Sequence, residues 1–213
     1  ETEKTYVLVL EFFESNLSAY IKENGFFNSE LENFQNLILN LGNALKILVK
    51  NKIMHRNINP ENIIVIEENG KSPIFKLANF TYATYISDND CEQVGDELYA
   101  APEITKNDIY NENCDIWSLG VVIYESFFGM SPLGKNINSN LVKNVIYNDN
   151  FSFELSNEPN FDTLLKKMLV INPKNRMSTN EFLSYIENNE FKNGILKINF
   201  EMKYDEENNE GFN

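Results

Sequence analysis

The chain has 213 residues, of which 42 % are hydrophobic and 13 % aromatic, and this composition excludes a disordered chain. Its net charge of −14 repels phosphate backbones, so we expect no nucleic-acid binding. Basic peptides fit the charge better as partners, although the acidic surface also serves simply to keep a protein soluble.

No apolar run reaches the roughly 18 residues of a membrane span, so we expect none. The two cysteines, Cys91 and Cys114, lie far apart in no metal-ligand pattern. A reducing compartment therefore fits better than a disulfide framework. We expect a cytoplasmic protein, either free, cytoskeletal or part of a large complex.

The first half of the chain predicts a strand and two helices. Residues 5–12 are apolar and partly β-branched, as in a buried strand. A short helix is expected after Ser15 or Asn16, either of which is a suitable cap. Ser29 is the predicted cap of a long amphipathic helix, in which apolar residues recur at steps of three and four. These are Leu31, Phe34, Leu37, Ile38, Leu41, Leu45 and Leu48.

A hairpin and a long loop follow. Residues 55–62 predict a short loop, and 63–66 an apolar strand. A polar turn over 67–73 leads into a partner strand over 74–77. Residues 81–100 show no period and carry several acids, which predicts a long acidic loop.

The remainder predicts helices. Residues 115–128 are almost all apolar, as in a helix buried on every side. Three amphipathic helices are expected over 137–147, 160–170 and 178–187, the last beginning with a capping box. The fold class is therefore α+β, mainly α.

Four segments carry recognisable motifs. They are His55 to Asn62 between helix and strand, Asn79-Phe80-Thr81, Ala101-Pro102-Glu103, and Asp115 to Gly120. In this order and spacing they resemble the signature set of the protein-kinase family. The resemblance implies a kinase-like C-terminal lobe with a small β-hairpin, and it is nearest to the calcium/calmodulin-dependent Ser/Thr kinases.

The resemblance also implies domain boundaries. Residues 1–14 correspond to the last strand of the upper lobe and the hinge, and 15–198 to the C-lobe. Residues 199–213 form an acidic tail that we expect to be flexible. Nothing else in the chain resembles the upper lobe, so we expect other proteins to cover the exposed upper face of the C-lobe.

Several positions depart from the family pattern. Asn57 stands where the family has its catalytic aspartate, and Asn59 where Ser/Thr kinases have a lysine. Asn79 replaces the metal-binding aspartate and Thr81 the glycine after it, whereas Asn62 matches a retained metal-side residue. These losses predict no intact catalytic residue, no metal site and no cofactor, with neither ATP nor magnesium held tightly.

Other family positions are retained and carry structural roles by resemblance. His55 corresponds to a core histidine below the catalytic loop, and Asp115 to the helix-cap aspartate that holds this loop. Glu103 and Arg176 correspond to a buried ion pair. Arg56 corresponds to the arginine that grips a phosphate on the activation loop.

One further departure and one hypothesis concern the acidic loop over residues 81–100. Asp96 follows Gly95 where the family usually has a threonine. One hypothesis is that loop acids hold Arg56 without phosphorylation, and the alternative is a solvated acidic loop. The candidate acids are Asp88, Asp90 and Glu92.

The family's catalytic and metal-binding residues are replaced, whereas its structural residues are retained, and this contrast leads to a prediction about function. We expect no enzyme but an inactive pseudokinase, acting as a protein-binding scaffold or a structural subunit of a larger assembly. The alternative is an atypical active Ser/Thr kinase that transfers phosphate from ATP, with its upper lobe outside this chain. A nucleotide-binding but inactive switch lies between the two.

Overall fold

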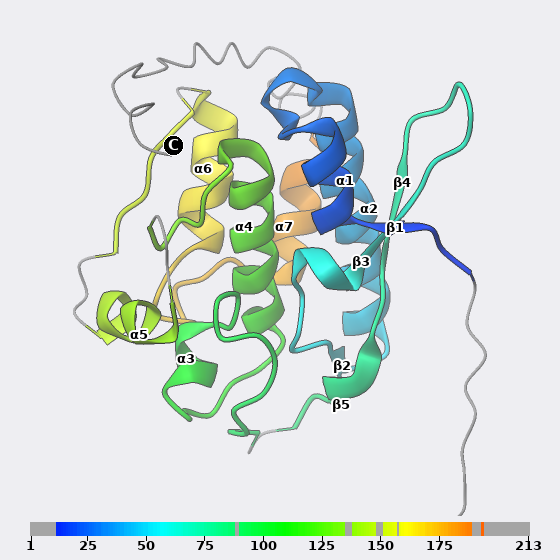
Figure 1. Cartoon of the computed structure of the whole chain (residues 1–213). Helices are drawn as coiled ribbons and strands as arrows, with labels where there is room; N and C mark the ends of the chain where they lie inside the picture. The colour runs from blue at the N-terminus through cyan, green and yellow to red at the C-terminus, as the bar shows by residue number, and fades with distance from the viewer. Residues whose placement is uncertain are drawn as a thin grey trace, which may run out of the picture.

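A computed structural model describes residues 12–87, 90–134, 138–147, 151–156, 158–188 and 193. Helices dominate, and two small sheets lie at one side and at one end of them (Figure 1). The α+β, mainly α fold class is confirmed. Most of the predicted strand over 5–12, and the tail from 199, lie outside the described residues.

The two N-terminal helices form where the apolar periodicity predicts them. In α1 (Leu17–Asn24), the cap is Asn16, whose Oδ1 accepts a hydrogen bond from the Ala19 amide at 2.9 Å. The long helix α2 runs over Leu31–Lys50. Ser29 is not its cap, because this residue ends a preceding 3-10 turn, η1 (Phe27–Ser29), and Glu30 stands between that turn and the helix.

The larger sheet has the order β1-β3-β4 and is antiparallel. Its strands are β1 (Ser15–Asn16), β3 (Ile63–Ile66) and β4 (Ile74–Leu77), of which the last two form the predicted hairpin. A second, two-stranded sheet pairs β2 (Ile53–Met54) with β5 (Thr84–Tyr85). Two-residue strands show no periodicity, so the sequence does not predict this sheet.

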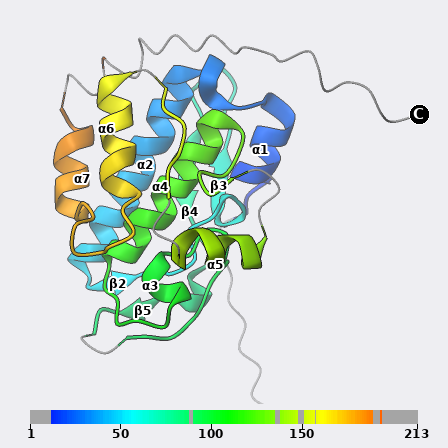
Figure 2. The ribbon, with the colours of Figure 1, turned by 90° about the vertical axis from the view of Figure 1, so that its left-hand side faces the viewer.

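The C-terminal half is built around one buried helix, α4, which runs between its neighbours in both views (Figures 1 and 2). Its side chains face protein on nearly all sides, as the apolar run predicts. The helices of this half are α3 (Pro102–Thr105), α4 (Asn113–Phe128), α5 (Ser139–Tyr147), α6 (Pro159–Met168) and α7 (Thr179–Ile186).

Aromatic rings join the main helices into one core. Phe34 of α2 lies 5.2 Å from Phe127 of α4 and 5.4 Å from Phe161 of α6, measured between ring centroids. All three side chains are fully buried. Burying three aromatic side chains at one junction fixes the packing of α2, α4 and α6, on which the site is built.

Two polar features complete the frame. The predicted capping box of α7 is present, with Ser178 and Glu181 bonding each other's backbone N–H groups. The Oδ1 of Asn40 on α2 accepts a hydrogen bond from the Phe75 amide of β4 at 2.9 Å, which ties the sheet to the long helix. None of the helices in the described ranges is long and apolar enough to cross a membrane.

Candidate active site

The loop between β2 and β3 is held from below by one buried carboxylate. Asp115 accepts hydrogen bonds from the backbone amides of His55 at 2.7 Å and Arg56 at 2.8 Å. Burial raises the pKa of Asp115 to about 6, against the lowering effect of these two bonds. Asp115 lies in the first turn of α4 but is not its cap, since that position belongs to Glu112.

His55 packs in the core beside this loop. Its Nε2 lies 2.9 Å from the carbonyl oxygen of Ala78, and its ring meets Phe80 edge to face at 5.0 Å. Burial lowers the pKa of His55 to about 4, so the ring is neutral at physiological pH. The side chain therefore joins the loop to the end of β4 by packing.

Three asparagine side chains fix the shape of the loop. The Oδ1 of Asn59 accepts from the amides of Glu61 and Asn62 at 3.0 and 3.1 Å and caps the 3-10 turn η2 (Pro60–Asn62). Its Nδ2 donates to the Oδ1 of Asn57 at 3.1 Å. Asn62 donates from its own Nδ2 to the carbonyl of Asn57 at 2.8 Å. A lysine side chain has no hydrogen-bond acceptor, so the lysine found at this position in Ser/Thr kinases could not cap η2 as Asn59 does.

The residues at the expected metal position do not fit a tight magnesium site. Asn79, in the left-handed conformation at φ 60°, donates from its Nδ2 to the Oδ1 of Asn62 at 2.9 Å. The Oδ1 of Asn79 accepts from the hydroxyl of Thr81 at 2.6 Å. Both oxygens are neutral and already accept hydrogen bonds, whereas magnesium prefers charged oxygen ligands. Among the residues the structure describes, no three His, Cys, Asp or Glu side chains group as metal ligands.

The acidic loop over residues 81–100 returns to the loop between β2 and β3 at Gly95. Gly95 has φ +83°, and a Cβ at this position would lie within van der Waals overlap of the Arg56 carbonyl, so the close approach requires glycine. The next residue, Asp96, donates its backbone N–H to the Oδ1 of Asn57 at 3.0 Å. Two segments 39 residues apart in sequence thus meet at Asn57.

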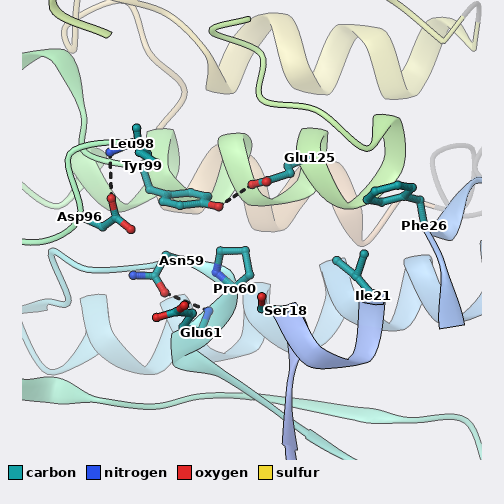
Figure 3. Close-up of a pocket in the computed structure, with 10 residues that line it drawn as sticks. All are labelled: Ser18, Ile21, Phe26, Asn59, Pro60, Glu61, Asp96, Leu98, Tyr99 and Glu125. Carbon is teal, nitrogen blue, oxygen red and sulfur yellow. Dashed lines mark hydrogen bonds between the residues drawn. The ribbon is translucent and has the colours of Figure 1, made fainter. Parts of the chain in front are cut away.

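A cavity of about 260 Å³ opens beside this junction (Figure 3). One side of it is formed by Tyr99, whose hydroxyl donates a hydrogen bond to Glu125 of α4 at 2.6 Å. Burial raises the pKa of Glu125, partly offset by the bond from Tyr99. Among the described residues, the lining contains no lysine or arginine; it consists of Ser18, Ile21, Phe26, Asn59, Pro60, Glu61, Asp96, Leu98, Tyr99 and Glu125.

Sequence reasoning missed most of this cavity. Of the acids that line it, the sequence marks only Asp96, as a departure from the family pattern. Glu125 lies within the apolar run of α4, where the sequence predicts a core position. Its polarity in that run is the one signal that marks it.

Arg56 is buried against the acidic loop. Its Nη1 lies 3.1 Å from both carboxylate oxygens of Asp90 and 3.5 Å from Glu92, and it donates to the Tyr110 hydroxyl at 2.9 Å. Its Nε donates to the carbonyl of Tyr82 at 2.7 Å. The third candidate acid, Asp88, lies outside the described residues.

A buried ion pair connects the end of this loop to the lower helices. Arg176 bonds Glu103 through two parallel contacts, Nη1 to Oε1 at 2.5 Å and Nη2 to Oε2 at 2.8 Å. Its Nε also donates to the Val170 carbonyl at 2.9 Å, and its guanidinium lies 5.3 Å from the centroid of the Trp117 ring. The pair thereby fixes α3 against α4 and the segment before α7.

This arrangement of loop, buried aspartate and helices is that of a protein kinase lobe. The family model of the protein kinase domain matches residues 1–186, and the chain belongs to this family.

Curated relatives are named as serine/threonine-protein kinases. The chain is 32 % identical over 152 residues to serine/threonine-protein kinase ULK3 of Xenopus laevis, covering 68 % of the chain and 32 % of the relative. It is 29 % identical over 181 residues to serine/threonine-protein kinase TIO of Arabidopsis thaliana, covering 84 % of the chain and 13 % of the relative. It is 29 % identical over 163 residues to serine/threonine-protein kinase ATG1 of Debaryomyces hansenii, covering 68 % of the chain and 19 % of the relative. The chain thus spans about a third or less of each of these relatives, and the nearer likeness to calcium/calmodulin-dependent kinases stays a prediction.

The prediction that the protein is not an enzyme is wrong. It is overturned by the match to the protein kinase domain and by relatives that are named as kinases. That prediction gave too much weight to the charges lost at Asn57 and Asn79. Phosphoryl transfer depends chiefly on positioning and on electrostatic stabilisation, so neutral residues at positions 57 and 79 do not by themselves show that transfer is absent.

Proposed function

We propose that the protein containing this chain is a serine/threonine kinase that transfers phosphate from ATP to a hydroxyl group of a basic peptide. The observation that carries the proposal is the ordered loop at Asn57, held by Asp115 below and by Asn59 and Asn62 beside it. This loop lies at the edge of a cavity large enough for a peptide side chain.

The chemistry that remains is slow rather than absent. An asparagine at position 57 does not itself supply the general-base help of about 10²- to 10⁴-fold that an aspartate there would give. Positioning of the hydroxyl group and of the phosphate is a separate contribution, which the held loop retains. We assign no step to a metal ion, because the amides of Asn62 and Asn79 do not fit one.

The test uses the full-length protein with γ-labelled ATP and serine peptides whose flanking residues are either basic or acidic. We expect slow label transfer to the basic peptide and less to the acidic one. Asn57→Ala is the control for a contaminating kinase, because it removes the oxygen that joins the two loops. No transfer by the natural protein, or equal transfer by Asn57→Ala, would contradict the proposal.

The cavity supports a basic peptide as substrate. Glu61 and Glu125 line it, and a cation placed there gains charge-assisted hydrogen bonds. We predict that Glu125→Gln raises KM for a lysine-containing peptide about tenfold, which corresponds to about 1.4 kcal/mol of binding. KM for the same peptide with norleucine in place of lysine should not change. An equal rise for both peptides would show that Glu125 only shapes the cavity.

Weak metal binding leads to a second prediction, measured as a thermal shift. ATP should raise Tm of the full-length protein by an amount that added magnesium does not change. Asn79→Asp restores a charged oxygen ligand, so this variant should show a shift that grows with magnesium. A magnesium-dependent shift in the natural protein would contradict this prediction, and the unchanged protein without ATP serves as the baseline.

We further propose that another protein covers part of the lobe. Its support is large side chains left exposed around the sheet, with Phe12 before β1 and Phe80 after β4 exposed by 83 % and 51 %. A cytoplasmic location and the absence of nucleic-acid partners remain predictions from the charge and the cysteines.

A further inference from the structure

Asn57 cannot take a proton from a substrate hydroxyl group, because an amide is not a base at neutral pH. Its hydrogen bonds also occupy the amide oxygen. Its Oδ1 accepts from Asp96 N at 3.0 Å and from Asn59 Nδ2 at 3.1 Å. An amide oxygen has two lone pairs, so both are used. The group left to face a substrate is the NH₂ of the amide, which donates hydrogen bonds.

The residue whose backbone contacts Asn57 is nevertheless an aspartate, Asp96. Because the Asp96 amide is bonded to Asn57, the Asp96 side chain begins at the catalytic loop itself. Asp96 lines the same cavity as Asn59 and Glu61 (Figure 3), and it is exposed to solvent. A substrate side chain entering that cavity meets the Asp96 carboxylate at the point where the two loops join.

The carboxylate is also oriented. Its Oδ1 accepts a hydrogen bond from the Leu98 amide at 3.0 Å. Gly95, immediately before it, is pressed against the Arg56 carbonyl in a conformation that favours glycine. In the described part of the chain, Oδ2 of Asp96 has no hydrogen-bond donor, so it is available to an incoming hydroxyl group.

We propose that Asp96 is the catalytic base, replacing the carboxylate that residue 57 lacks; this rests on the proposed kinase function. The substrate oxygen forms a bond to the γ-phosphorus of ATP, and the bond from this phosphorus to the bridging oxygen breaks. ADP leaves with the electron pair, and the hydroxyl proton passes to Oδ2 of Asp96. The base thus comes from the acidic loop rather than from the catalytic loop.

The test measures phosphate transfer by the full-length protein and by Asp96→Asn. Asparagine keeps an oxygen for the Leu98 amide, so the loop should hold its shape, and an unchanged Tm checks this. We expect kcat to fall by about 10²-fold or more, with KM for the peptide changed by less than about threefold. Glu97→Gln removes the neighbouring charge, which does not line the cavity, and should leave kcat unchanged.

The rescue variant separates a base from a merely structural residue. Asn57→Asp added to Asp96→Asn supplies a carboxylate from the other loop and should recover at least tenfold of the lost kcat. If the natural protein transfers phosphate and Asp96→Asn does so equally fast, or if the rescue fails, Asp96 is not the base and the kinase function stands. If the natural protein transfers none, both proposals are wrong.

Discussion

Replacing Arg176 by methionine should lower the free energy of unfolding by about 3–5 kcal/mol, the range for breaking one partner of a buried ion pair. The side chains of Arg176 and Glu103 are 0 % and 2 % exposed, so the substitution leaves a carboxylate buried without its cation. The backbone carbonyls of Asn113 and Val170 lose a donor in the same step. Urea unfolding followed by circular dichroism measures the change.

The matched control is Lys174→Met, which makes the same type of substitution two residues away on an exposed side chain. It should change the free energy of unfolding by no more than about 0.5 kcal/mol. The double variant Glu103→Leu with Arg176→Met removes both charges, so it should be more stable than the sum of the two single losses predicts. Additive losses, or a loss below about 1 kcal/mol in Arg176→Met, would show that the pair contributes little.

The sequence predicts the parts of this fold that repeat a local pattern. The apolar steps of α2, the continuous apolar run of α4 and the capping box at Ser178 each occur within one segment, so local chemistry decides them. Ser29 shows where local chemistry fails. A cap residue alone does not say whether a 3-10 turn intervenes before the helix.

The candidate site is less predictable because its contacts are long-range. Asn57 meets Asp96 across 39 positions, and Tyr99 meets Glu125 across 26. No periodicity encodes such pairs, since they depend on how α4 packs beneath both loops. The kinase resemblance locates the catalytic loop through residues 55–62, but it does not show that Asn59 caps η2 or that Asp96 lines a cavity.

The same limit applies to Arg56. A basic residue and several acids in a facing loop suggest an ion pair, but sequence alone does not say which acid approaches. The structure places Asp90 against Arg56, with side chains 11 % and 7 % exposed, and leaves Glu92 mostly in solvent. Burial distinguishes the two, because only the shielded pair escapes screening by water and salt.

Asp90→Ala should therefore destabilise the protein by about 3 kcal/mol, toward the lower end for a broken buried pair. Arg56 keeps the Tyr82 carbonyl and the Tyr110 hydroxyl as acceptors, so it is not left wholly unpaired. The loop over residues 81–100 should also become more open to proteases, since Asp90 ties it to the catalytic loop. Asp108→Ala, at an exposed position, is the matched control and should change neither stability nor cleavage.

Treatment with a phosphatase distinguishes a loop held by Asp90 from a loop that phosphorylation orders. In kinases whose activation loop is phosphorylated, the added phosphate pairs with arginine and orders the loop. Here a carboxylate on Asp90 already occupies Arg56, so phosphatase treatment should leave both Tm and the cleavage rate of 81–100 unchanged. If dephosphorylation alone loosens the loop, or if Asp90→Ala is cleaved no faster than Asp108→Ala, Asp90 does not hold it. An Asp90-held loop would keep Gly95 and Asp96 against Asn57 at all times, because they lie on the same segment.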